Sequence, residues 1–438
     1  GWILGVGHEQ ALADAATGDL RPPPRLKNDC FALPPGVDWT PVDEALSRLR
    51  ANLLPVAAVE TIACGEAFGR VLAVDAIAAR SNPPAANSAV DGYGFAHSAV
   101  SLGDQLLPVV EGRAAAGAAF EGEVPFGSAI RILTGALLPK GVDTVVLEED
   151  TTSNGVEIAF EGPIQPGANA RKAGEDIKAG AVVVQAGVRL GPAHLALLAA
   201  TGVREVVTFA PLRVGVLSTG DEIVAPGSTP DLSRTYDANR PMLLALLADW
   251  RMEGVDLGHV GDDRAKLTAL LDEAAQNVDM ILTSGGASAG DEDHVSAALG
   301  EGGVRHDWRI ALKPGRPLAL GMWNGTPVFA LPGNPVAALV CTLIFARPAL
   351  AVMGGESWCE PQGLMVPAAF SKTKKSGRRE YLRARMNSDG AVEVFHSEGS
   401  GRISGLAWAT GLVELGDRAQ TIKPGDLVRY IPYDSFRS

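Results

Sequence analysis

The spacing of hydrophobic positions changes near residue 212, and the change separates two kinds of fold. From there to residue 331, short apolar runs such as Val214–Leu217, Val255–Val260 and Met280–Thr283 alternate with segments whose apolar residues recur at helical spacing. Apolar strands that alternate with helices favour a mostly parallel sheet covered on both faces. The sequence therefore predicts a doubly wound α/β domain in this region.

Two other stretches favour β structure. From Ser88 to about Ala168 the chain shows short strands and turns, and we interpret this part as an insertion, because mixed helical and strand patterning lies on both sides of it. Beyond Glu360 short strands return, which predicts a small C-terminal β-barrel or sandwich. Asn154-Gly155 predicts a hairpin between Val145–Leu147 and Val156–Ala159. Asn324-Gly325 predicts an antiparallel edge on the α/β sheet.

The pattern also indicates where particular helices begin and end. Thr40 is expected to be the N-cap of the first helix, with Pro41 in its first turn, and Asn239 is expected to cap a later one. The longest apolar helix, Pro335–Phe345, is expected to stop at Arg347-Pro348, which would leave it too short to span a bilayer. We therefore expect no membrane segment.

Composition narrows the class of protein. A length of 438 residues implies about three or four domains. The formal charge of −13 argues against nucleic-acid binding, which requires a basic surface. The four cysteines have no Cys-x-x-Cys spacing, and the N-terminus lacks the features of a signal peptide. We expect a protein of the reducing cytoplasm.

Candidate chemistry is concentrated after the strand Met280–Thr283, in the loop Ser284–Asp293. Glycines in such a loop let several backbone N–H groups face an anion, and Asp291 and Asp293 could hold a magnesium ion against phosphate oxygens. Lys313 and Arg316 would then neutralise negative charge. The alternative is a serine- and glycine-rich surface loop beside solvated charges.

Two further carboxylates are predicted to reach the same edge of the sheet. Glu222 follows the strand Val214–Leu217, and Asp262 follows Val255–Val260. Ligands of open α/β sheets bind at the carboxyl ends of the strands, and clustered carboxylates repel one another unless a cation intervenes. The alternative for both residues is a favourable charge at a helix N-terminus.

Several motifs in the chain resemble the molybdopterin molybdotransferases, the MoeA family, of which the gephyrin E domain is a eukaryotic relative. The resemblance runs from about Asp38 to the C-terminus. The motifs that carry it are Ser88-Ala89-Val90-Asp91-Gly92-Tyr93-Gly94-Phe95, Arg131-Ile132-Leu133-Thr134-Gly135-Ala136, Gly174-Glu175-Asp176-Ile177, Ser284-Gly285-Gly286 with Gly290 and Asp293, Lys313-Pro314-Gly315, and Leu331-Pro332-Gly333-Asn334-Pro335-Val336.

The resemblance implies a multidomain, elongated α/β plus β protein with a central molybdopterin-binding domain. Combined with the pattern, it predicts an extension at 1–37, a mixed domain from 38–82 and 171–208, a β-rich insertion at 83–170, the α/β domain at 209–356 and the C-terminal β-barrel at 357–438. The implied reaction inserts molybdenum from molybdate into adenylylated molybdopterin, with magnesium-dependent release of AMP. The implied enzyme is a cytoplasmic homodimer whose active site is shared between subunits.

The resemblance also implies roles for particular residues. The catalytic group would be Asp91, Thr134, Asp176, Glu222 and Asp293, and the Mg²⁺ ligands Asp293, Glu222 and Asp262. The substrate-binding group would be Ser284, Gly285, Gly286, Ser288, Arg309, Lys313, Arg316, Pro332, Asn334, Arg378 and Ser400.

Some of these positions have simpler explanations or depart from the family pattern. Asp91 and Thr134 could serve only a turn, and Arg378 could belong to a solvated basic run. Ala337 stands where a relative carries serine. Arg309 and Arg316 stand where relatives carry lysine, so a planar guanidinium with several N–H donors replaces the compact charge of an ammonium group.

Two other functions remain open at this stage. The α/β domain alone resembles molybdopterin adenylyltransferases, which would consume ATP together with free molybdopterin. A scaffold role, which gephyrin also serves, would need an exposed hydrophobic groove and a partner peptide.

Overall fold

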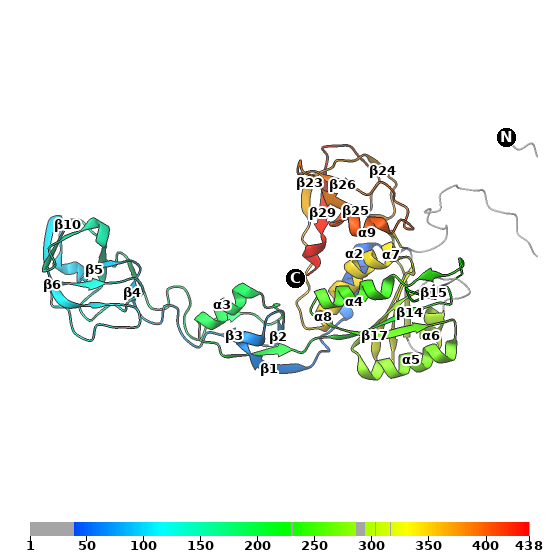
Figure 1. Ribbon diagram of the computed structural model, residues 1–438, viewed down its shortest axis with the longest axis horizontal. Coiled ribbons are helices and arrows are strands. Elements are labelled where there is room, and N and C mark those ends of the chain that lie inside the picture. Colours follow the sequence, from blue (N-terminus) through cyan, green and yellow to red (C-terminus); the bar gives the residue numbers. More distant parts are fainter. Residues whose placement is uncertain (1–38, 229–230, 286–293, 303, 316, 438) are drawn as a thin grey trace, which may run out of the picture. The chain divides into compact units, whose positions relative to one another are not determined.

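The computed structural model describes residues 39–228, 231–285, 294–302, 304–315 and 317–437 (Figure 1). One of its sheets has six strands, in the order β17-β14-β18-β22-β21-β19. These strands are β14 (Arg213–Thr219), β17 (Glu253–Val260), β18 (Met280–Ser284), β19 (Val304–Arg309), β21 (Pro317–Trp323) and β22 (Thr326–Leu331).

Strand directions confirm the predicted α/β fold. β14 runs parallel to both β17 and β18, and β18 runs parallel to β22. β21 and β19 complete the sheet as antiparallel strands. The predicted hairpin at Asn324-Gly325 joins β21 and β22, and both residues have positive φ values, 48° and 82°. Such a pair matches the right-handed twist of the flanking strands.

Helices cover both faces of this sheet. On one face Val214, Val216 and Phe329 pack into a core cluster with residues of α2 (Val42–Asn52), α4 (Asn239–Asp249) and the helices after β22. On the other face Ile281 and Val328 pack against α5 (Arg264–Asn277) and α6 (His294–Gly302). Each fully buried aliphatic side chain contributes about 1.5–3 kcal/mol, so both layers are held mainly by apolar burial.

The helix after β22 corrects one prediction. It begins as α7 (Pro335–Cys341), continues through a π-helical turn (Thr342–Ala346) and ends as α8 (Arg347–Met353), so Arg347-Pro348 does not interrupt it. A proline inside an α-helix lacks an N–H donor and crowds the carbonyl four residues earlier. A π turn, Thr342–Ala346, precedes Pro348, so the backbone before the proline departs from regular α-helical pairing and the helix continues through it.

The resulting 19-residue helix, Pro335–Met353, meets the length and composition of a membrane span. Within the fold, 89% of its most apolar window is buried. A core helix of a folded domain passes the same test, and here α4 and the central sheet pack around it.

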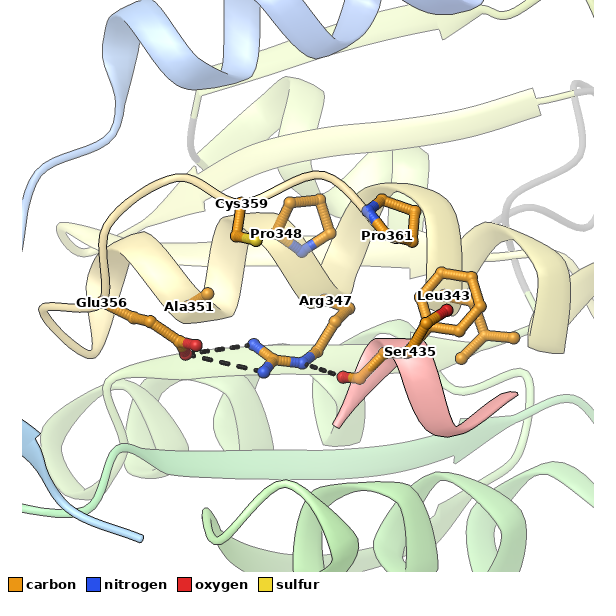
Figure 2. Close-up of a pocket in the computed structure, with 9 residues that line it drawn as sticks. Leu343, Arg347, Pro348, Ala351, Glu356, Cys359, Pro361 and Ser435 are labelled. Atoms are coloured by element: carbon orange, nitrogen blue, oxygen red, sulfur yellow. Dashed lines mark hydrogen bonds and ion pairs between the residues drawn. The ribbon is translucent and has the colours of Figure 1, made fainter. Parts of the chain in front are cut away.

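Arg347 lies on this helix and ties three segments together. Its Nε donates to the carbonyl of Phe436 at 2.6 Å, and its Nη1 lies 3.4 Å from Oε2 of Glu356. The same carboxylate oxygen accepts from Arg189 at 2.8 Å. Figure 2 shows the Arg347 guanidinium between Glu356 and the C-terminal turn η5 (Tyr433–Phe436). Breaking such a buried pair by removing one partner costs about 3–5 kcal/mol, so this contact anchors the C-terminus.

The N-terminal half of the chain contains a second six-stranded sheet, in the order β8-β5-β7-β6-β10-β9. Its strands are β5 (Gly92–Phe95), β6 (Gly103–Ala114), β7 (Ala129–Ile132), β8 (Thr144–Leu147), β9 (Thr152–Ser153) and β10 (Glu157–Gly162). The turn at Asn154-Gly155 is present, but it joins β9 to β10. The predicted hairpin partner, β8, pairs with β5 instead, so that pairing was wrong.

Short strands on both sides of this sheet pair with each other. β3 (Ala76–Ile77) pairs with β12 (Val182–Val184), and β4 (Asn87–Ser88) pairs with β11 (Ala170–Arg171). The chain therefore enters and leaves the sheet through neighbouring strands. A separate three-stranded sheet has β13 (Glu205–Phe209) between β1 (Val59–Ala63) and β2 (Val71–Leu72). The helix α3 (Pro192–Ala200) lies between β12 and β13 in the chain.

The C-terminal part is mostly β structure around its own apolar cluster. Its main sheet has the order β20-β25-β27-β29-β23, with β26 paired to β25, and β24 pairs with β28. The bounds are β20 (Leu312–Lys313), β23 (Leu364–Pro367), β24 (Lys372–Lys374), β25 (Arg379–Met386), β26 (Val392–Val394), β27 (Gly411–Leu415), β28 (Gln420–Ile422) and β29 (Leu427–Pro432), with the short helix α9 (Ser404–Trp408).

The first helix begins one residue later than expected. Pro41 is its N-cap, and Thr40 is not the cap because its backbone is paired elsewhere. The Thr40 N–H donates to the carbonyl of Arg309 at 2.8 Å, and its own carbonyl accepts from the N–H of Ala311 at 2.9 Å. An extended pairing of this kind satisfies the donor and acceptor that a capping turn would otherwise use.

An ion pair links this helix to the C-terminal sheet. Arg379 donates to both carboxylate oxygens of Asp43, at 2.7 and 2.9 Å, and its Nε donates to Asp417 at 3.1 Å. A bidentate arginine pair fixes geometry as well as charge. The hydrogen bond from Arg379 holds the pKa of Asp43 below its ordinary value of 3.8.

This pair predicts a pH-dependent contribution to stability. Because the pKa of Asp43 is lowered in the folded state, its contribution is present above the unfolded pKa and disappears as the pH falls through the folded one. Asp43→Asn should lower the free energy of unfolding by about 0.5–1 kcal/mol near pH 7, since the Asp43 side chain is largely exposed. Urea denaturation from pH 7 down to about pH 3.5 should show this difference shrinking only below about pH 4.

Glu44→Gln is the matched control, because the Glu44 carboxylate pairs with Arg48 of the same helix and not with the C-terminal sheet. It should leave the unfolding free energy nearly unchanged across the range. An Asp43→Asn difference that stayed constant down to the lowest pH would contradict the assignment.

Candidate functional site

The site begins where three parallel strands end together. Ser218 on β14 is in register with Ser284 on β18, and Ser284 is in register with Leu331 on β22. Just beyond these positions is a pocket of about 340 Å³. It is lined by Ser218, Thr219, Glu222, Ile223, Thr235, Tyr236, Asp237, Ala238, Asn239, Ser284, Gly285, Gly333, Asn334, Pro335, Ser400, Gly401 and Ile403. The predicted placement of a site at the carboxyl edge therefore agrees with the pocket's position.

Gly285 turns the chain out of β18 and requires the absence of a side chain. Its φ is +84°, a left-handed conformation that other residues rarely adopt. A Cβ atom at this position would also lie 2.7 Å from the backbone oxygen of Thr219. Two strand-end loops thus approach each other more closely than a substituted residue would permit.

Asn239 holds these loops together, a role that differs from the predicted one. Its Nδ2 donates to Oγ of Ser284 at 2.6 Å and to the carbonyl of Gly333 at 2.8 Å. A carbonyl only accepts, so the orientation of this amide is fixed by Gly333. The side chain is 4% exposed, and its Oδ1 is buried without a partner among the described residues.

Asn239 is not the predicted helix cap. The N-cap of α4 is Ala238, and the carboxylate of Asp237, just before it, accepts from the N–H of Arg240 at 3.2 Å. Both Asp237 and Asn239 line the pocket and are nearly fully buried. The available sequence signal was two short polar residues before an apolar helix, which favours a cap without saying which residue supplies it.

Asn334 connects the α/β sheet to the C-terminal β part. Its Oδ1 accepts from the N–H groups of Val336 and Ala337, at 3.0 and 3.2 Å, and so caps α7. Its Nδ2 donates to the carbonyl of Ser400 at 2.9 Å. The predicted residues Asn334 and Ser400 therefore line one pocket. Pro332, also predicted, is half-buried two residues before Asn334.

The predicted carboxylates are placed differently from one another. Glu222 lines the pocket. Asp262 does not line the pocket. Its carboxylate accepts from the N–H of Asp221 at 3.3 Å, and the carboxylate of Asp221 accepts from the N–H of Asp262 at 2.9 Å. Asp262 also lies 3.9 Å from His294. Asp263 is the N-cap of α5 and Asp262 lies directly before it, so the alternative role of Asp262 as a charge at the helix N-terminus stays a prediction.

In the described part of the chain, no three carboxylate, histidine or cysteine side chains gather as a metal cluster. Asp291 and Asp293 lie outside the described residues, as do Gly286, Ser288 and Arg316. Glu222 remains as a hard oxygen donor at the pocket. Magnesium in phosphate sites commonly takes only one or two protein carboxylates and completes its shell with phosphate and water oxygens.

Lys313 lines a second, smaller recess of about 30 Å³ rather than the main pocket. The two recesses are neighbours, because Pro335 lines one and Val336 the other. The Nζ of Lys313 donates to Oε2 of Glu398 at 2.9 Å. The basic turn that follows Lys313 packs on α7, since Gly315 lies against Ala337 and Cys341.

Asp91 and Thr134, two predicted catalytic residues, meet in the N-terminal half. Oδ1 of Asp91 accepts from the N–H of Thr134 at 2.7 Å and from its hydroxyl at 2.8 Å. These two bonds hold the pKa of Asp91 below its ordinary value, so the carboxylate is ionised at neutral pH. Neither residue lines the pocket described above.

Three more predicted residues are distributed over other elements. Asp176 accepts from Nδ2 of Asn82 at 3.0 Å. Arg309 ends β19 with an exposed side chain, and its carbonyl accepts from Thr40. Arg378 is only 9% exposed, so the alternative of a solvated basic run was wrong for it.

The arrangement can bind a polar, anionic group. Ser284 Oγ already accepts from Asn239, which leaves its hydroxyl proton to donate to a ligand oxygen. The first N–H groups of α7 are already bonded to Asn334, so side-chain hydroxyls such as that of Ser284 supply the donors at the pocket. Hydroxyl donors suit phosphate oxygens.

Comparisons with known proteins agree with this geometry. The model of the MoeA N-terminal region (domains I and II) matches residues 40–202. The model of a probable molybdopterin binding domain matches residues 215–352, and that of the MoeA C-terminal region (domain IV) matches residues 365–433.

Individual relatives match over nearly the whole chain. The molybdopterin molybdenumtransferase of Haemophilus influenzae is 35% identical over 399 residues, covering 90% of this chain and 98% of that protein. Molybdopterin molybdenumtransferase 2 of Mycobacterium tuberculosis is 34% identical over 390 residues, covering 86% and 96%. The crystal structure of the molybdopterin biosynthesis MoeA protein of Pyrococcus horikoshii OT3 superposes with a TM-score of 0.78 at 28% identity, covering 90% of this chain and all of that one.

Substitution of Gly285 tests the close approach of the loops. Gly285→Ala should lower the free energy of unfolding by the cost of its positive φ, about 1 kcal/mol, plus about 1–3 kcal/mol for overpacking against Thr219. Gly227→Ala is the control, because Gly227 has a φ of +91° but a Cβ added there would meet no atom within 4 Å. Equal losses for both variants in denaturant unfolding would argue against the contact.

Substitution of Asn239 tests the buried clamp. Asn239→Leu keeps the side-chain volume but removes both donors, so we expect a loss of about 1 kcal/mol in stability and faster amide hydrogen exchange at Gly285 and Asn334. Asn277→Leu is the matched control, because Asn277 Nδ2 donates within its own helix, to the carbonyl of Glu273. Unchanged exchange at both loops in Asn239→Leu would show that the amide does not hold them.

Proposed function

The chain belongs to the MoeA family of molybdopterin molybdenumtransferases, and from that premise we propose how it works: it transfers molybdenum from molybdate to adenylylated molybdopterin and releases AMP. The transferase activity in molybdenum cofactor biosynthesis is that of relatives matching nearly the whole chain. The observation that supports this particular reaction most directly is the polar pocket where β14, β18 and β22 end. Its serine, glycine and asparagine lining suits the phosphates of a pterin nucleotide.

Phosphoanhydride cleavage requires positioning and neutralisation of charge more than a strong nucleophile. In this proposal the Ser284 hydroxyl, oriented by Asn239, donates to a phosphate oxygen. Gly285 and Gly333 allow the phosphate to approach the backbone. Asn334 keeps the Ser400 loop against the mouth of the pocket, which helps to exclude water.

Magnesium fits this site on the chemistry of its donors. We assign Glu222 as a ligand, together with Asp293 and, at the next strand end, Asp262. When bound, the ion would neutralise phosphate charge and polarise the scissile bond. The carboxylate of Glu222 also places a negative charge beside an anionic substrate, which is unfavourable unless a cation intervenes.

The molybdate site in this proposal lies in the neighbouring recess. Lys313 lines it, and Arg378 and Ser400 belong to the same C-terminal part of the chain. A tetrahedral dianion is suited to ammonium, guanidinium and hydroxyl donors. The recess and the pocket adjoin at the first turn of α7, so the dithiolene end of a bound pterin would reach molybdate there.

The chain acts as a homodimer in this proposal. Asp91 and Thr134 form a hydrogen-bonded pair, and their carboxylate and hydroxyl are exposed. Neither lines the pocket of its own chain. A partner subunit would therefore bring Asp91, Thr134 and Asp176 to the substrate.

A single assay tests the reaction. The purified protein should release AMP from adenylylated molybdopterin when molybdate and magnesium are added, and Glu222→Gln should slow that release by about tenfold or more. Glu253→Gln is the control, because Glu253 begins β17 at the opposite edge of the sheet and pairs with Arg213. It should release AMP at the normal rate.

Normal AMP release by Glu222→Gln would count against its role as a magnesium ligand. Consumption of ATP with free molybdopterin, without molybdate-dependent AMP release, would replace the proposed reaction by that of an adenylyltransferase.

A further inference from the structure

Two lysines from different strands share one carboxylate beside the main pocket. Lys313 is the last residue of β20, and Lys372 is the first of β24. Nζ of Lys313 donates to Oε2 of Glu398 at 2.9 Å, and Nζ of Lys372 donates to the other oxygen of the same carboxylate. Glu398 therefore presents one oxygen to each ammonium group, as two oxygens of a tetrahedral oxyanion would.

The three side chains differ in how firmly they are held. Lys313 and Lys372 are 14% and 10% exposed, whereas Glu398 is 44% exposed. Lys372 has a second anchor in Glu380, whose Oε2 lies 3.0 Å from its Nζ. The lysines are thus fixed within the protein, and the carboxylate is the member that can rotate into solvent.

The backbone beneath Glu398 is fixed as well. Arg383 donates to the carbonyls of Ser397 and Gly399, at 2.8 and 3.1 Å, and to that of Arg402. The loop that carries Glu398 is therefore braced on both sides of it. Displacement of Glu398 requires rotation of a side chain and no rearrangement of the loop.

Space and charge both indicate that Glu398 and an oxyanion exclude each other. The recess beside Lys313 and Glu398 has about 30 Å³, which is room for about two water molecules. Burial of the Glu398 carboxyl opposes its ionisation, but Lys372 and Lys313 outweigh this and hold its pKa below the ordinary value. At neutral pH an ionised carboxylate consequently occupies the position where the two ammonium groups converge.

We propose that Glu398 is a built-in competitor of the oxyanion substrate, which occupies Lys313 and Lys372 until the oxyanion displaces it and thereby sets the affinity for that anion. This inference rests on the proposed function in taking molybdate as the oxyanion. A dianion carries more charge than the single carboxylate it replaces, so the exchange favours dianions over monoanions. Lys372 becomes a second oxyanion ligand, contributed by a segment that the motifs do not include.

Binding of oxyanions to the full-length chain tests the proposal without depending on turnover. Glu398→Gln removes the competing charge and keeps the shape, so calorimetric titration with sodium molybdate, and separately with sodium sulfate, should give a dissociation constant lowered about tenfold. Glu393→Gln is the matched control, because Glu393 on β26 forms an ion pair with Arg385 of the neighbouring strand β25. It should bind both anions as the wild type does.

A double variant makes the result specific. If both lysines receive the anion, Lys372→Gln added to Glu398→Gln should abolish the gain in affinity. An unchanged or weaker affinity in Glu398→Gln, for a variant that melts at the wild-type temperature, would overturn the proposal, as would absence of oxyanion binding by every variant. A Glu398→Gln variant that gains affinity while no protein releases AMP would support the competitor and reject the proposed reaction.

Discussion

The candidate site depends on the register of three parallel strands. Because β14, β18 and β22 run in the same direction and are aligned at Ser218, Ser284 and Leu331, the segments after them leave the sheet at one edge. This alignment brings Ser218, Ser284 and Gly333 to the same pocket. A shift of one residue in β18 would turn Ser284 to the other face of the sheet, and Asn239 could no longer bind it. Apolar packing on both faces of the sheet fixes the register, so the core determines the site.

Several cations of this acidic protein are paired with its own carboxylates. Arg379 bridges Asp43 and Asp417, Arg347 faces Glu356, and Lys313 and Lys372 share Glu398. The first two contacts join distant segments and are structural. The third differs because two largely buried lysines converge on one carboxylate there, beside the pocket. Because the protein has a net charge of −13, the cations of an anion-binding site must not be locked in permanent ion pairs with its own carboxylates. A carboxylate that the anion can displace meets that requirement.

Local patterns predicted the elements of the fold well, and they failed where a distant segment intervened. The hairpin at Asn324-Gly325 was correct because positive φ at two adjacent residues is a property of those residues. Thr40 is not a helix cap because its backbone pairs with residues 309 and 311, more than 260 positions away. The break expected at Pro348 is absent because a π turn, which no periodicity indicates, precedes it. β8 took β5 as its partner although a hairpin turn followed it closely.

Contacts between distant segments also explain which residues of the candidate site could be predicted from the sequence and which could not. Ser284, Gly285, Asn334 and Ser400 were predicted from motifs, and all of them line one pocket. Asn239 was predicted to be a cap, because its partners Ser284 and Gly333 are 45 and 94 residues away. No sequence motif indicated Glu398, because its role depends on contacts with Lys313 and Lys372 that exist only in the folded chain. Motifs therefore identified groups that line the pocket, whereas the side chains that position or oppose those groups are visible only in the folded chain. A resemblance transfers the former to a new sequence, and each chain has to be examined for the latter.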